Sequence, residues 1–323
     1  RRFFLSAPLF LFLFHDINFH RPIHLHNDKT PEFASLTEKG VFIATKEKIS
    51  FLPLGGLSRT GKWSLSFGKE EIVGMAADNT RCYVLTKDSL LRTVSTEGIQ
   101  ENVLLAPGNV VAMAANNSSL LLFSETKTTA LSSLYTFPDL GINTAHIPIK
   151  NILWLGFDRE GSPAFYTDEK MLFVFSIRKS LWLPVASTNK NIWPVGIEAG
   201  SLFFVPLGEE KEHPDAKATH QVHTQALSVP LLEQESAFNK TLARKQTREA
   251  IGLLRDTDTA GGDKDILEMA KAAVNENETH KIEYLADSLA EEESRKELLV
   301  LLEESSLSLV AQRLRRKWNS PAE

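Results

Sequence analysis

Cysteine is almost absent from this sequence, and so are a long apolar run and a large excess of one charge. The single cysteine, Cys82, can form no disulfide within the chain, which is typical of reducing compartments, and its apolar neighbours favour core packing. Lys and Arg number 36 against 41 Asp and Glu, so the net charge of -5 does not indicate nucleic-acid binding.

The most apolar run, residues 3–14, is shorter than the roughly 20 residues that a membrane-spanning helix needs. Two arginines precede it, as in a signal peptide, but no small-residue cleavage site follows. A buried strand is therefore favoured over a signal peptide, and no membrane partner is expected.

What the sequence does contain is an internal repeat with a period of about forty residues. Each unit has an apolar run, a tight polar turn and a second apolar run, and most units add a third run. Four strands in about 40–45 residues make one β-propeller blade, because radial stacking covers both faces of each small sheet. The five visible units begin at Phe33, Ile72, Val110, Ile152 and Ile192.

The repeat predicts a mainly β fold, a six-bladed β-propeller, followed by a small C-terminal α-helical bundle. A sixth blade would be closed by strands around residues 10–14 together with residues 226–229. No Trp-Asp dipeptide occurs, although it marks many propeller repeats, and solenoid and β-sandwich folds remain alternatives.

The helical bundle is expected because the apolar period changes from two towards 3.6 after Pro230. This change predicts a propeller domain in residues 1–230 and a helical domain in residues 231–323. A first helix is expected to end near Asp256, and the pair Gly261-Gly262 to break the chain. The expected N-terminal caps of the later helices are Asp263, Thr279, Ser294 with Glu297 as a capping box, and Ser305 or Ser306.

No motif predicts an enzymatic site. Residues 56–62 match most of a phosphate-binding loop, but Trp63 replaces the Ser or Thr, and a strand-like alternation follows where a helix is needed. His20, His24 and His26 lack further ligands for a zinc site. We therefore expect no catalytic residue, no cofactor and no metal. The alternative is a propeller hydrolase, which would need converging His, Asp and Glu at its central channel.

A basic cluster on the last expected helix leaves three interpretations open. It could contact DNA, complement the dipole at the C-terminal end of the helix, or bind an acidic peptide. Complementation of the helix dipole is favoured over contact with DNA. Ala311 is small and lies between Leu307 and Leu314, so it could open a groove for a partner helix beside Arg315. The cluster consists of Arg313, Arg315, Arg316 and Lys317.

Several segments follow one another in a familiar order and spacing. They are HRPIH at 20–24, PGNVVAMA at 107–114, LWLGFDREGSP at 153–163, WLPV at 182–185, WPVGI at 193–197, residues 203–207, Glu283, and residues 285–287 and 309–314. In these segments the chain resembles the SepB-domain region of a eukaryotic replisome adaptor family. That family includes the chromosome transmission fidelity protein of yeast and the acidic nucleoplasmic DNA-binding protein of animals.

The resemblance implies a homotrimer assembled through the propellers and a scaffold role at the replication fork, in the nucleus and associated with chromatin. It implies that the helical domain binds short helical peptides with an acidic start and an apolar end. These peptides come from the DNA polymerase alpha catalytic subunit and from the GINS component of the replicative helicase, and three copies would hold several of them by avidity.

Such a hub would serve DNA replication and sister-chromatid cohesion, and it would contact chromatin or DNA indirectly. The resemblance also implies a set of residues that line the peptide groove. They are Leu285, Ala286, Leu289, Ala311, Leu314 and Arg315.

Overall fold

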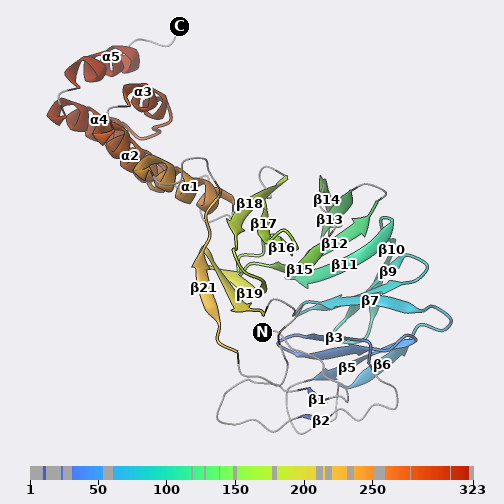
Figure 1. Ribbon diagram of the computed structural model, residues 1–323. Coiled ribbons are helices and arrows are strands. Elements are labelled where there is room, and N and C mark those ends of the chain that lie inside the picture. Colours follow the sequence, from blue (N-terminus) through green and yellow to red (C-terminus); the bar gives the residue numbers. More distant parts are fainter. Residues whose placement is uncertain are drawn as a thin grey trace.

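The computed structural model is mainly β, with a series of small antiparallel sheets followed by helices (Figure 1). Among the residues that it describes, no helix combines the length and the apolar character needed to cross a membrane. The described residues are 10–11, 23–24, 31–53, 61–117, 119–126, 129–137, 139–147, 151–176, 180–208, 214, 220–230, 236–250, 259–276, 278–305 and 307–319.

Strands that are neighbours in the chain are also neighbours in each sheet. Four sheets have four strands each, in the orders β3-β4-β5-β6, β10-β9-β8-β7, β11-β12-β13-β14 and β15-β16-β17-β18. A fifth sheet has the order β19-β20-β21, and β1 pairs with β2 in a sheet of two strands. Where the connection between two paired strands is described, it is mostly a short polar turn, as expected for antiparallel hairpins.

The strands of the first two of these sheets are β3 (Phe33–Leu36), β4 (Gly40–Ala44), β5 (Lys48–Pro53), β6 (Trp63–Ser66), β7 (Ile72–Ala77), β8 (Arg81–Thr86), β9 (Leu90–Ser95) and β10 (Gln100–Leu105). Those of the next two are β11 (Asn109–Asn116), β12 (Ser119–Glu125), β13 (Ala130–Thr136), β14 (Gly141–Ile147), β15 (Ile152–Phe157), β16 (Pro163–Thr167), β17 (Met171–Ser176) and β18 (Leu181–Ser187). The remaining strands are β19 (Ile192–Glu198), β20 (Ser201–Pro206), β21 (His223–Ala226), β1 (Phe10–Leu11) and β2 (Ile23–His24).

Each unit of the predicted repeat corresponds to one antiparallel sheet of the structure. All five predicted unit starts lie at the beginning of the first strand of a sheet, in β3, β7, β11, β15 and β19. These first strands lie next to one another in the same order, and the sheets fan out from them as the blades of a propeller do (Figure 1). The prediction of five repeated antiparallel sheets is confirmed.

The sixth blade does not form in the predicted way. Ala226 ends β21 and pairs with Ser201 of β20, so this part of the chain belongs to the fifth sheet. The prediction that residues 226–229 help to close a sixth sheet is therefore wrong for Ala226. Of the expected strand at residues 10–14, Phe10 and Leu11 are described, and they pair with β2.

Two of the hairpin turns begin with an aspartate, but they differ in how the carboxylate is hydrogen-bonded. In the β7–β8 turn, the Asp78 carboxylate accepts the backbone N–H of Arg81 at 2.8 Å and the hydroxyl of Tyr83 at 2.9 Å. In the β15–β16 turn, Oδ1 of Asp158 accepts the N–H of Ser162 at 2.6 Å, whereas buried Oδ2 has no hydrogen-bond partner among the described residues. Burial raises the pKa of the Asp158 carboxyl to about 6, because the ionised form loses its hydration.

Replacing Asp158 by asparagine is expected to stabilise the chain at neutral pH. The carboxyl ionises near pH 3.8 when unfolded and near pH 6 when folded, so between these values the folded chain keeps a proton that the unfolded chain has lost. The free energy of unfolding therefore falls as the pH rises through this window, by on the order of 2–3 kcal/mol. Asparagine does not ionise, so the free energy of unfolding of Asp158→Asn should not fall in this way. Its stability relative to the wild type should therefore increase across the window.

Urea unfolding of the two proteins at several pH values from about 4 to about 7.5 measures this difference. All other titrating groups are common to both proteins and cancel in the comparison. Parallel stability curves across the window would contradict the prediction.

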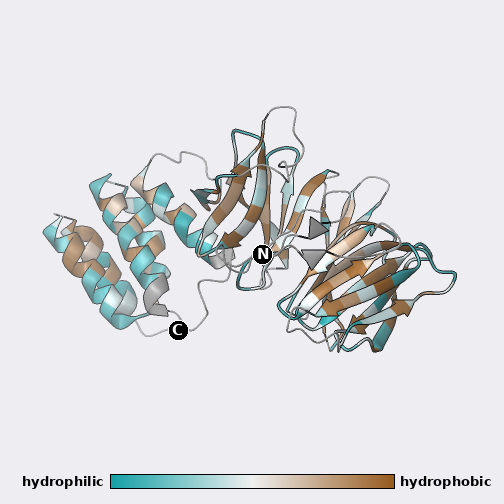
Figure 2. Ribbon diagram, turned by 90° about the horizontal axis from the view of Figure 1, so that it is seen from below, coloured by the Kyte–Doolittle hydropathy of each residue, from teal (hydrophilic) through white to brown (hydrophobic). Residues whose placement is uncertain are grey.

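The described helices follow the last strand and share one buried apolar cluster. The first of them lies against β17 and β18, so the helical part begins beside the fourth sheet (Figure 1). Figure 2 shows apolar and polar residues side by side along these helices, as expected for amphipathic helices with a buried face. They are α1 (Ala237–Ala250), α2 (Thr259–Asn275), α3 (Thr279–Asp287), α4 (Glu292–Glu304) and α5 (Ser308–Asn319).

The structure contradicts the predicted chain break and helix cap at the start of α2. Gly261 and Gly262 lie within the helix and do not break the chain, and Asp263 is an interior residue and not the cap. A glycine costs a helix only about 1 kcal/mol, which the burial of the apolar face of α2 outweighs. The predicted end of the first helix, near Asp256, lies outside the described residues.

Three of the other predicted caps also differ from the structure, whereas Ser306 lies outside the described residues. Thr279 is the first residue of α3, and Glu278 is its N-cap. Ser294 is buried inside α4, so the predicted capping box with Glu297 is wrong. Ser305 ends α4, where its hydroxyl donates to the carbonyl oxygen of Leu301 at 2.7 Å, and it does not begin α5.

Candidate partner-binding site

The structure brings five of the six predicted groove residues together, but in the core and not on an open surface. Leu285 and Ala286 lie on α3, Leu289 follows it, and Ala311 and Leu314 lie on α5. Each of the five is at most 3% exposed, and all belong to the buried cluster of the helices. They therefore do not line an accessible groove here. The small side chains of Ala286 and Ala311 allow α3 and α5 to pack closely, and this packing leaves no open groove between the two helices.

The sixth predicted residue, Arg315, is at the surface. Its side chain is half exposed, and its guanidinium lies 2.6 Å from a carboxylate oxygen of Glu303 on α4. An exposed pair of this kind contributes little to stability. Arg315 can therefore exchange Glu303 for the carboxylate of a partner at small cost.

Two further residues of the basic cluster, Arg313 and Lys317, also find acidic partners within the helical part. Arg313 pairs with Glu283 at 2.9 Å and Lys317 with Asp287 at 2.6 Å, and both carboxylates belong to α3. These pairs connect α5 to α3 along one edge. They offset most of the positive charge that direct DNA binding would need, so no described contact favours that interpretation.

Sequence patterns did not identify the apolar side chains that the helices expose. Tyr284 on α3 is 75% exposed and Leu309 on α5 is 72% exposed. Val300 on α4 is also exposed. The sequence does contain a sign of this exposure, since Tyr284 and Leu309 fall outside the apolar stripe of their helices. Single exposed apolar residues are common, however, and sequence alone does not place these three on neighbouring helices.

The sheets expose apolar residues as well, on their last strands. These strands lie at the edges of their sheets, where unpaired backbone groups can accept a further strand or a partner chain. The exposed apolar residues on or beside β10, β14 and β18 are Ile99, Val103, Leu105, Leu140, Ile142 and Leu181.

The described residues hold none of the catalytic arrangements considered from the sequence. No group of three or more His, Cys, Asp and Glu side chains is arranged to hold a metal within them. The part of the phosphate-loop motif that is described, Gly61 and Lys62, leads into strand β6 and not into a helix. Cys82 is fully buried, as predicted, and burial raises the pKa of its thiol.

Comparisons with known proteins identify relatives for most of the chain. Residues 12–231 match the model of a family described as minichromosome loss protein, Mcl1, middle region. Protein ENHANCER OF LHP1 1 of Arabidopsis thaliana is 25% identical over 243 residues, which are 67% of this chain and 26% of the relative. WD repeat and HMG-box DNA-binding protein 1 of Xenopus laevis is 25% identical over 217 residues, 57% of this chain and 19% of the relative.

Thus the chain spans about a quarter or less of the length of these curated relatives. Among solved structures, that of HIRA(644-1017) superposes with a TM-score of 0.51 at 13% identity. The superposition covers 88% of this chain and 97% of the HIRA chain. At this level of identity the likeness concerns the fold alone.

Proposed function

Because the chain belongs to the family of the minichromosome loss protein Mcl1, whose middle region it matches over residues 12–231, we propose that it is a non-enzymatic scaffold of the DNA replication fork. The family match is the observation that carries this proposal. It agrees with the replisome adaptor family that the sequence resembles, and the assignment to a SepB domain is part of the proposal. The protein acts in the nucleus, on chromatin, in DNA replication and sister-chromatid cohesion.

In this proposal residues 1–230 form a six-bladed propeller and residues 231–323 a separate helical domain. Three copies assemble through their propellers into a closed homotrimer. The exposed apolar residues on the edge strands β10, β14 and β18 support such an assembly, because burial of apolar area drives protein association.

The helical domain then presents three equivalent sites to helical peptides from the DNA polymerase alpha catalytic subunit and from GINS. Arg315 meets the acidic start of the peptide in place of Glu303. Its apolar end packs on exposed Leu309 and Tyr284, while the five buried groove residues, Ala311 among them, hold α3 and α5 at the required spacing beneath it. An acidic and apolar peptide matches a surface that offers arginine and exposed apolar side chains.

Light scattering with and without such a peptide, at micromolar protein concentration, tests both parts of the proposal. The expected mass is that of three chains, increased by bound peptide. Without peptide, Arg315→Glu should have the same mass of three chains. It should weaken peptide binding about tenfold, which corresponds to about 1.4 kcal/mol. Arg244→Glu is the control, because Arg244 is equally exposed but lies on α1, where it pairs with Glu268 and with Asp265.

A monomeric mass would exclude the homotrimer. Peptide affinity that is the same in the wild type and in Arg315→Glu, or equally weakened by Arg244→Glu, would exclude the proposed binding surface.

A further inference from the structure

The outer edges of the sheets differ in how far they are blocked against pairing with a further strand. Proteins block such edges with short strands, bulges, proline or charge. The outer strands β6 and β21 have four residues each, and β10 carries a bulge at Glu101, which pairs with Arg81. β18 has a bulge in its pairing with β17 and contains Pro184. Each of these four edges is therefore protected.

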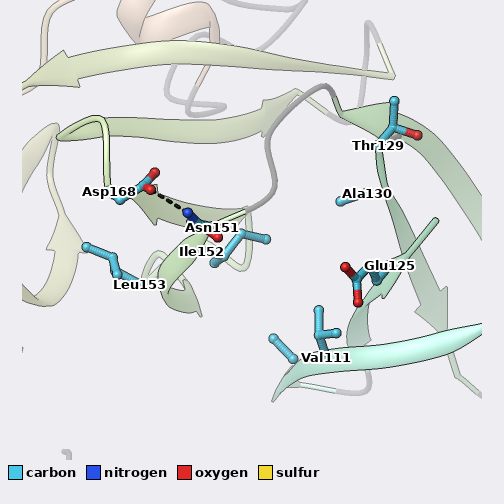
Figure 3. Close-up of a pocket in the computed structure, with 9 residues that line it drawn as sticks. Val111, Glu125, Thr129, Ala130, Asn151, Ile152, Leu153 and Asp168 are labelled. Carbon is cyan, nitrogen blue, oxygen red and sulfur yellow. Dashed lines mark hydrogen bonds between the residues drawn. The ribbon is translucent and has the colours of Figure 1, made fainter. Parts of the chain in front are cut away.

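The inner edges of the sheets are interrupted as well. The pairing of the first strand with the second shifts in register in β7, β11, β15 and β19, and β3 has four residues. In β11 and β15 the skipped residues are Val111 and Leu153, which line the cavity between these two sheets (Figure 3). The first strands also lie next to one another, so they offer no continuous edge to a further strand.

Among the outer strands of these five sheets, β14 alone has none of these protections. It has seven residues, without proline, aspartate, glutamate, lysine or arginine. It pairs with β13 over all seven residues, from Gly141 to Ile147, without a shift in register. Five of the seven residues are exposed, although most residues of β12 and β13 are buried. The outward backbone groups of β14 are therefore accessible over most of its length (Figure 1).

One side of β14 offers three exposed side chains at alternate positions. Ile142, Thr144 and His146 point to the same side, because residues two apart in a strand do so. Ile142 is 56% exposed, and no described residue forms a hydrogen bond or an ion pair with the side chain of His146. Asp139, also exposed, precedes the strand at the end where Ile142 lies. This side of the strand therefore has an aliphatic position near a carboxylate at one end and an imidazole at the other.

We propose that β14 binds an extended segment of a partner protein, which pairs with it antiparallel as a fifth strand of the β11–β14 sheet. In this segment an acidic residue lies opposite His146, a β-branched residue opposite Thr144 and an aliphatic residue opposite Ile142. Because antiparallel strands run in opposite directions, the acidic residue comes first in the segment and the aliphatic residue four positions later. The reverse order would bring the acidic residue close to Asp139, where like charges repel.

The occupant is a segment of another protein and not β14 of a second copy. Antiparallel pairing of two β14 strands about Thr144 would place Ile142 of each copy opposite His146 of the other. It would also create a two-fold axis, which the proposed closed homotrimer does not contain. The exposed apolar residues of β10 and β18 remain for contacts between copies. The site lies on a sheet, so its use does not depend on the peptide site proposed for the helices.

The probe is a labelled short peptide in which glutamate, threonine and valine, in this order, alternate with serine, titrated into the full chain. Amide NMR should place its binding at residues 141–147 and show slowed hydrogen exchange at alternate backbone N–H groups of β14, which the new strand covers. Two N-methylated probes test the pairing directly. Methylation of every second residue blocks one edge of the probe, so one of the two complementary probes should lose binding and the other should keep it.

The side-chain contacts are tested by variants at exposed positions, whose fold thermal unfolding checks. His146→Glu should weaken binding at least tenfold, and a probe with lysine in place of glutamate should restore it. Ile142→Lys should also weaken binding at least tenfold, because lysine protects an edge strand. Val222→Lys is the matched control and should keep the wild-type affinity, since Val222 is 50% exposed and lies directly before β21, the outer strand of another sheet.

Four results would overturn the proposal. They are the same response of both N-methylated probes, equal affinity for a probe in which glutamate and valine are exchanged, equal loss in Ile142→Lys and Val222→Lys, or mutual exclusion of the probe and the assembly of copies in light scattering. The last result would place β14 between copies of the chain and would leave the homotrimer itself intact.

Discussion

Replacing Ala311 by glutamate is expected to unfold the helical part of the chain. Ala311 is 1% exposed and packs in the apolar cluster that α2, α3, α4 and α5 share. A glutamate there would bring a longer side chain and an unpaired charge into a tightly packed apolar space. The expected loss is roughly 3–5 kcal/mol, a large part of the stability of a small domain.

Leu309→Glu is the matched control, because it introduces the same charge in the same helix at a position that is 72% exposed. It should leave the fold unchanged, since exposed substitutions change stability by about 0.5 kcal/mol or less. Circular dichroism at the helical minimum during urea unfolding measures both variants. Equal stability of the two would show that Ala311 faces an open groove.

This pair of variants also decides how peptide binding can be studied. A loss of peptide affinity in Ala311→Glu would reflect an unfolded domain as much as a damaged site. Leu309→Glu and Arg315→Glu alter only exposed groups and keep the core intact. They separate binding from folding, which a substitution at any of the five buried positions does not.

The sheets could be predicted from the sequence because their signals are local. Each unit combines short apolar strands with turn residues, and hairpins form between neighbours in the chain, so the period of about forty residues translates directly into sheets. How the series of sheets ends depends on long-range contacts. The pairing of Ala226 with Ser201 joins segments separated by a long polar stretch, and nothing local distinguishes β21 from a strand of another sheet.

The helix ends and the site could be predicted less well, because tertiary contacts outweigh local preferences there. Gly261 and Gly262 are helix breakers by propensity, yet they lie in α2. In the site, the apolar period correctly selected Leu285 and Leu314 as inward-facing, but it does not distinguish a core from a groove. That distinction depends on how closely α3 and α5 approach each other.

Asp263 has the second largest expected effect, and its role also depends on tertiary contacts. The residue is 2% exposed, and its two carboxylate oxygens accept the backbone N–H of Ala290 at 3.1 Å and of Glu291 at 2.8 Å. Glu291 is the N-cap of α4, so a side chain of α2 satisfies donors at the start of another helix and places its negative charge at the positive end of that helix.

Replacing Asp263 by alanine should therefore cost roughly 2–4 kcal/mol, because two backbone N–H groups lose a charged acceptor at a buried position. Asp263→Asn should cost less, since one oxygen remains as an acceptor. Asp287→Ala is the surface control: it removes an exposed carboxylate that pairs with Lys317 on α5, and it should change stability by less than about 1 kcal/mol. Urea unfolding of the three variants ranks them, and a loss in Asp263→Ala no larger than in Asp287→Ala would mean that the α3–α4 connection is held by other contacts.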